Sequence, residues 1–166
     1  MPSEQEKTIQ RLNRSRKQIL NAMAGLNEDQ ASSLAVTGVW TIKDLFGHIT
    51  AWDTTILHPL ELFYTSNEFI TEPIEDYLAW NDDQAEQRAV RSYSQILAEF
   101  SEIRSALIAA YQSLPADMLL GIFTAPWGDK YTISKMISGL AWHEAEHANE
   151  ISQWREGMNL DSKLNP

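Results

Sequence analysis

Histidine and glutamate residues near the end of the chain have a spacing that can support metal chemistry. Residues 143–147 read HEAEH and fit the pattern H-E-x-x-H. On a helix, residues four apart share one face, so His143 and His147 can bind one metal ion. Zinc peptidases carry this pattern and use its glutamate as the general base. The motif therefore raises two questions: whether the histidines hold a metal, and what Glu144 does beside them.

The rest of the chain argues against a peptidase. A zinc peptidase of this type takes its third ligand downstream of the motif, and the residues after His147 include no further histidine. Glu150 follows too closely to come from a separate element. A peptidase would also usually offer an edge strand for an extended substrate, whereas this sequence is predicted to be almost wholly helical.

A third histidine is expected to face the same interior. His48 lies on the flank of the apolar stripe of a predicted helix, next to Ile49 and near Trp52, while His147 lies within the inward stripe of its own helix. Three neutral imidazoles leave coordination positions for water or substrate, as catalytic zinc sites do. We therefore predict a divalent metal on His48, His143 and His147. The alternative is that each histidine is a hydrogen-bonded core or boundary residue.

Carboxylates near these histidines are candidates for supporting roles. Glu144 is the leading candidate for proton transfer, and the alternatives are a fourth ligand or an acid at the edge of the core bonded to a neighbour. Asp44, one turn before His48, and Glu150, near His147, are candidates to orient an imidazole, with a solvated surface position as the alternative for both. The candidate pocket residues are Trp52, Trp142 and, at the mouth, Trp80 and Asn81.

Helical periodicity predicts the elements that position these residues. Apolar residues recurring at three, four and seven predict helices over residues 4–25, from Thr41 to a stop or kink at Pro59, over 83–113, and from Thr132 to about Glu156. Residues 26–40 are expected to be a loop or short turn, 66–82 an irregular crossover, and 119–131 a loop with room for a short extended pair. The predicted fold is all-α: one four-helix-bundle domain, residues 1–166, with a long crossover between helices two and three.

Composition restricts the compartment and the partners. The net charge is −10, from 13 basic and 23 acidic residues. The one basic cluster, Arg11 to Lys17, is expected to be a solvated outer face, so we expect no nucleic-acid partner. There are no cysteines, which excludes disulfides and thiolate ligands and fits a reducing cytosol. No stretch approaches the roughly 20 apolar residues of a membrane helix, so we predict a cytoplasmic protein without a membrane partner.

Three segments together resemble a known family. GVWTIKDLFGHITAWD (38–53), WN (80–81) and HEAEHANEISQW (143–154) resemble the DinB/YfiT-like superfamily, and the chain is most similar to its ClbS/DfsB branch. The resemblance implies a four-helix bundle with the long connection between helices two and three, often as a homodimer. It also implies a divalent metal on three histidines, whose matching positions are His48, His143 and His147.

The resemblance also implies a range of chemistries. Members of the superfamily include transferases and isomerases that use low-molecular-weight thiols, and inferred hydrolases, while the ClbS branch protects its host by acting on a reactive small molecule. We therefore expect a metal-dependent hydrolase or thiol transferase that acts on a small-molecule substrate, in detoxification or self-resistance. Zinc and nickel are the expected metals, with a low-molecular-weight thiol as a second cofactor candidate. The alternatives are a small-molecule-binding protein with a structural metal or none, and a dimeric bundle whose histidines only pack.

Overall fold

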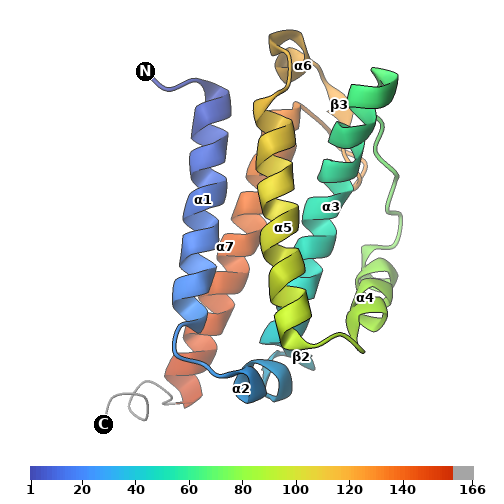
Figure 1. Cartoon of the computed structure of the whole chain (residues 1–166). Coiled ribbons are helices and arrows are strands. Elements are labelled where there is room, and N and C mark those ends of the chain that lie inside the picture. The colour runs from blue at the N-terminus through green and yellow to red at the C-terminus, as the bar shows by residue number, and fades with distance from the viewer. Residues whose placement is uncertain (159–166) are drawn as a thin grey trace.

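Four long helices form the body of the protein in the computed structural model, which describes residues 1–158 (Figure 1). These are α1 (Glu4–Met23), α3 (Ile42–Ser66), α5 (Tyr93–Gln112) and α7 (Ile133–Met158). Helix α1 packs along α7, and α3 packs along α5. In Figure 1, α1 and α7 run in one direction while α3 and α5 run in the other. Since α3 and α5 are parallel, the chain must return between them, and residues 67–92 make that crossover. The predicted four-helix bundle is confirmed.

Polar residues at the helix starts account for where the long helices begin. The Thr41 side chain accepts from the backbone N–H of Asp44, and the Asp44 carboxylate accepts from the backbone N–H of Thr41 at 2.9 Å. This reciprocal pair satisfies two N–H groups that the first turn would leave unpaired. Thr132 begins α7 similarly, since its hydroxyl accepts from the N–H of Lys135 at 3.2 Å.

The crossover contains a helix that divides the predicted 83–113 element in two. Helix α4 (Tyr77–Arg88) ends before α5 begins. Asp76 caps α4, and Ser92 caps α5 in a reciprocal box with Gln95. The Ser92 box makes a new helix start favourable there. The irregular residues of the crossover are therefore 67–76 and 89–92. In Figure 1, α4 stands outside the bundle next to α3.

Pro59 does not end α3, which continues to Ser66. The proline nitrogen cannot donate to the carbonyl one turn earlier, which normally weakens a helix interior. Leu60 and Phe63, beyond the proline, are buried in the core. Burial of such side chains contributes about 1.5–3 kcal/mol each, which offsets the missing hydrogen bond.

Short elements close the two ends of the bundle. Three short elements precede α3: helix α2 (Glu28–Ser33) and strands β1 (Ala35–Thr37) and β2 (Trp40–Thr41). Three others precede α7: helix α6 (Ala116–Leu120) and strands β3 (Phe123–Thr124) and β4 (Lys130–Tyr131). The antiparallel pair β3–β4 confirms the expected extended pair, and Gly128 takes a φ of 95° in its turn. Within residues 1–158, no helix is long and apolar enough to cross a membrane.

Candidate metal centre

The three predicted histidines meet between α3 and α7. The Nε2 atom of His143 lies 3.0 Å from the Nε2 of His48 and 3.0 Å from the Nε2 of His147. One ring nitrogen from each residue lies within 4.8 Å of the others. His143 and His147 are one turn apart on α7, and His48 comes from the second turn of α3. The close packing of these two helices therefore brings together side chains that are far apart in sequence.

Two of the three imidazoles, those of His48 and His143, are held in their neutral form. Burial, and then the neighbouring His143 and His147, lower the pKa of His48 to about 2. Burial, and then His147, lower the pKa of His143 to about 3. A neutral imidazole carries one N–H and one lone pair, and a lone pair is what a metal ion requires. Near neutral pH, these two side chains are therefore ready to act as ligands without losing a proton.

The geometry and the chemistry of the donors fit a divalent metal. Three nitrogens bound to one zinc at about 2.0–2.1 Å with tetrahedral angles lie roughly 3.3 Å apart. Two of the three pairs, at 3.0 Å, are close to that spacing, and the third lies within 4.8 Å. Neutral lone pairs crowded together repel one another unless a hydrogen or a cation lies between them. An all-imidazole set suits zinc, nickel and iron, so the residues do not select one of these metals.

Glu150 fixes the orientation of one ligand. The Nδ1–H of His147 donates to Glu150 Oε2 at 2.7 Å, and Thr37 donates to the same oxygen at 3.1 Å. With the hydrogen on Nδ1, the lone pair of His147 lies on Nε2, which faces His143. A carboxylate in this position also raises the basicity of the ligand. These contacts place Glu150 where it can orient His147, which is one of the two alternatives that the sequence leaves open for this residue.

Asp44 does not take the orienting role for which it was one candidate. Its carboxylate accepts from the backbone N–H and the hydroxyl of Thr41, so it caps α3. Among the described residues, no hydrogen-bond partner reaches the buried His48 Nδ1. The centroid of the Trp40 ring lies 4.8 Å from that of His48. Aromatic packing, rather than a carboxylate, therefore positions the His48 imidazole.

Substitution of the two carboxylates separates these roles. We expect Glu150→Gln to weaken zinc binding by about 10- to 100-fold, the usual cost of losing a partner that orients a ligand. Asp44→Ala should lower the free energy of unfolding by about 1 kcal/mol through loss of the cap and leave zinc affinity unchanged. Competition with a chromophoric chelator measures affinity, and urea unfolding measures stability. Equal loss of zinc affinity in both variants would contradict the assignment.

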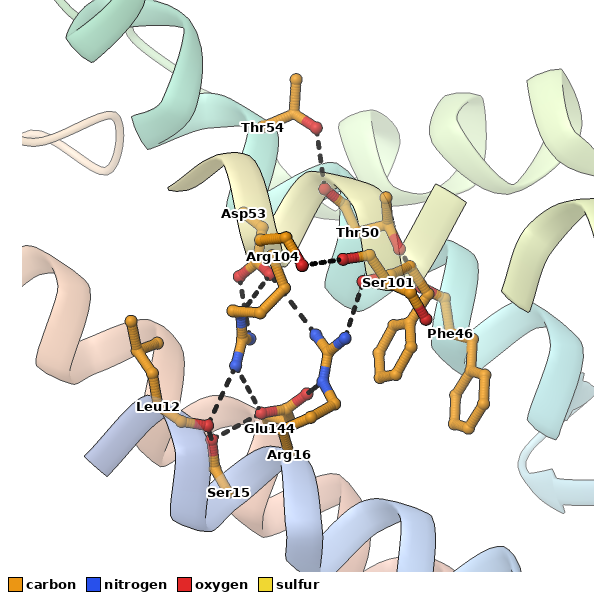
Figure 2. Close-up of polar contacts among 12 residues, drawn as sticks. Leu12, Ser15, Arg16, Phe46, Thr50, Asp53, Thr54, Ser101, Arg104 and Glu144 are labelled. Atoms are coloured by element: carbon orange, nitrogen blue, oxygen red, sulfur yellow. Dashed lines mark hydrogen bonds and ion pairs between the residues drawn. The ribbon is translucent and has the colours of Figure 1, made fainter. Parts of the chain in front are cut away.

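Glu144 points toward Arg16 and Arg104 in the interior of the bundle (Figure 2). Its side chain is 0% exposed. One carboxylate oxygen accepts from Ser15 at 2.5 Å and from Arg104 at 2.8 Å, and the other accepts from Arg16 at 2.7 Å. These partners come from α1 and α5. The geometry thus favours the alternative of an acid bonded to its neighbours over proton transfer or a fourth ligand.

A buried ion-pair cluster surrounds Glu144, and the sequence reading missed it. Arg104 binds both oxygens of Asp53, at 2.7 and 3.1 Å, in addition to Glu144. The side chain of Arg16 is only 14% exposed and lies over the Phe100 ring, so its assignment to a solvated basic face is wrong. One residue could have indicated this buried cluster from the sequence. Arg104 lies between Phe100 and Leu107 on the apolar face of its helix, where a charged side chain needs a buried partner.

A cavity of about 740 Å³ opens over the histidines. Of the expected pocket residues, Trp52, Asn81 and Trp142 line it, and the indole N–H of Trp52 donates to Asn81 at 3.1 Å. Trp80 instead stacks behind Trp52, with ring centroids 4.7 Å apart, and lines a separate, smaller cavity. The aromatic lining residues that the sequence did not single out are Trp40, Tyr77, Trp127 and Tyr131. Helices α3, α4 and α7 and the loop before α7 thus supply the walls.

Comparison with known proteins identifies the family. A family model described as the DinB superfamily matches residues 11–151. The chain belongs to the DinB superfamily. This confirms the resemblance drawn from the three sequence segments. A search among proteins of curated function finds no match.

Solved structures of this superfamily fold are similar over nearly the whole chain. The colibactin self-resistance protein ClbS, in complex with double-stranded DNA, is 18% identical with a TM-score of 0.76 and covers 94% of this chain and 98% of its own. YfiT from Bacillus subtilis, a probable metal-dependent hydrolase, is 20% identical with a TM-score of 0.73 and coverage of 96% and 90%. A mycothiol-dependent maleylpyruvate isomerase is 10% identical with a TM-score of 0.73 and coverage of 91% and 61%. At these identities the likeness shows a shared fold.

The exclusion of nucleic acid as a partner, which the sequence suggested, is wrong. ClbS, which has the same fold, is crystallised with double-stranded DNA. The exclusion was based on the net charge of −10 and on one basic cluster near the start of the chain. Net charge describes the whole surface, whereas binding depends on the local arrangement of charges. Charge alone therefore does not remove this class of partner.

Proposed function

We propose that this protein is a metal-dependent enzyme that acts on a small electrophilic or hydrolysable molecule, as a hydrolase or a thiol transferase. The observation that supports this most directly is the meeting of His48, His143 and His147 at the base of a 740 Å³ cavity. Three ligands from the protein leave room for water or substrate on a metal. Cavities of a few hundred Å³ suit small organic ligands. A homodimer and a role in detoxification are further parts of the proposal, which rest on the resemblance.

The residues of the chain have distinct tasks in this proposal. When bound, a divalent metal lowers the pKa of a coordinated water or thiol and polarises the substrate. His48, His143 and His147 hold it, and Glu150 keeps the His147 proton on Nδ1. The aromatic walls exclude water from the substrate side of the cavity. Glu144 has no part in proton transfer here, because its oxygens are bound by Ser15, Arg16 and Arg104.

Metal content is the first test of the proposed function. Protein purified without a metal-affinity tag should contain close to one equivalent of a divalent metal by elemental analysis, and the His48→Ala/His147→Ala variant should contain none. The loaded protein is then assayed with activated esters and epoxides, with and without glutathione. Protein that holds no metal and takes up none on titration would refute the proposal of a metal-dependent enzyme. Metal in the wild type with no turnover of either substrate class would favour a binding protein.

A further inference from the structure

The backbone of α7 does not require a glycine at position 139. Gly139 lies inside α7, one turn before His143, and its φ is not positive. Glycine in a helix interior costs about 1 kcal/mol relative to alanine. A Cβ built on Gly139 meets no atom within 4 Å, so close packing does not exclude a side chain. Since Gly139 lines the cavity, its missing side chain leaves bare backbone in the cavity wall.

Aromatic rings line much of the same cavity. The rings of Trp52 and Trp127 lie 6.3 Å apart, and those of Trp127 and Tyr131 lie 6.4 Å apart. Trp142 is 67% exposed and Tyr77 is 58% exposed. Large exposed aromatic side chains around a hollow are typical of a binding surface. The exposed faces of these rings, together with the bare backbone at Gly139, suit a conjugated ligand whose own flat face can lie against them.

The charges at the cavity disfavour an anionic ligand. Among the described residues that line it, Lys135 is the only lysine or arginine, while Glu146 and Glu150 are acids. Glu150 is already bonded to His147 and Thr37. The whole chain adds a net charge of −10, which repels anions at longer range. Glutathione, with two carboxylates, would meet one lysine here.

We propose that the cavity takes a flat, conjugated molecule without net negative charge, and that Gly139 provides the space in which it lies. This inference rests on the proposed function, because it names the class of substrate for the same site. It assigns Gly139 a role in specificity, since any side chain there would project into the space of the ligand. It also predicts that glutathione and similar acidic thiols bind poorly to the metal-free protein.

The test uses three naphthalene probes that share the flat ring and carry a neutral, a cationic or an anionic substituent at position 2. Calorimetry on the metal-free protein compares 2-naphthylmethanol, 2-naphthylmethylammonium and 2-naphthalenesulfonate. We expect the neutral and cationic probes to bind at least about 10-fold more tightly than the anion, a difference of about 1.4 kcal/mol. Equal affinities, or preference for the sulfonate, would overturn the proposal. Because no metal is present, the result is independent of whether the histidines bind one.

Substitutions on α7 test the place of Gly139. Gly139→Ala should raise the melting temperature, because alanine has the higher helix propensity. Gly139→Leu should leave the helix folded but lower the affinity for the tightest-binding probe at least about 10-fold, or 1.4 kcal/mol. Gly157→Ala is the matched control, because Gly157 is on the same helix, also has no atom within 4 Å of a built Cβ, and lies outside the cavity. A folded Gly139→Leu protein that binds the probe like wild type would refute the role of this glycine.

Discussion

Zinc added to metal-free protein is expected to raise its free energy of unfolding by about 4 kcal/mol when free zinc is about 1,000 times its Kd. The physical reason is that the native fold brings His48 next to His143 and His147, whereas the unfolded chain separates them. A ligand that binds only the native state stabilises it by mass action. Urea unfolding at fixed pH, with and without buffered zinc, measures the difference.

Removal of two of the three histidine ligands should abolish the zinc-dependent rise in the free energy of unfolding. The His48→Ala/His147→Ala variant keeps one imidazole of the three, so its unfolding curve should not move with zinc. His58→Ala is the control, because His58 is an exposed residue of α3 that does not line the cavity over the histidines, and it should keep the full effect. A double variant stabilised by zinc as strongly as wild type would show that the stabilising metal binds elsewhere.

The sequence predicted best those features that depend on neighbours along the chain. The helix starts at Thr41 and Thr132 and the apolar periodicity of the long helices are local features, and the structure shows them where the sequence predicts them. The His143–His147 pair is equally local, because it depends only on helical spacing. The sequence also allowed His48 to be placed with this pair, because the apolar stripe of its helix indicates which side of that helix faces the core.

Other features depend on contacts between distant segments, and sequence reasoning did not find them. Glu144 was assigned to the histidines because it lies between them in sequence, but adjacent helix residues point about 100° apart. Its actual partners, Arg16 and Arg104, come from α1 and α5. The break before Ser92 was missed because a polar residue at a helix start resembles one on an exposed helix face. Trp127 and Tyr131 reach the cavity from a loop, where no periodicity indicates direction.

Glu144→Ala should lower the free energy of unfolding by about 3–5 kcal/mol, the usual cost of removing one partner from a buried ion pair. The variant leaves Arg104 and Arg16 with fewer acceptors, while Asp53 still binds Arg104. Both arginines also donate to backbone carbonyls and cannot readily turn to solvent. Glu146→Ala, two residues along the same helix and exposed, is the control and should change stability by less than about 0.5 kcal/mol.

Glu144→Gln keeps the shape of the side chain and decides between a structural and a catalytic role for this residue. In the ion-pair cluster, the amide cannot balance the charges of Arg16 and Arg104, so the variant should unfold at lower urea. Its zinc affinity should fall as well, because Glu144 directly follows His143 on α7 and Asp53 follows His48 by five residues on α3. The cluster that joins Glu144 to Asp53 through Arg104 thereby holds these two helices in register (Figure 2). A proton-transfer residue would give the reverse: stability and zinc binding unchanged, with turnover lost.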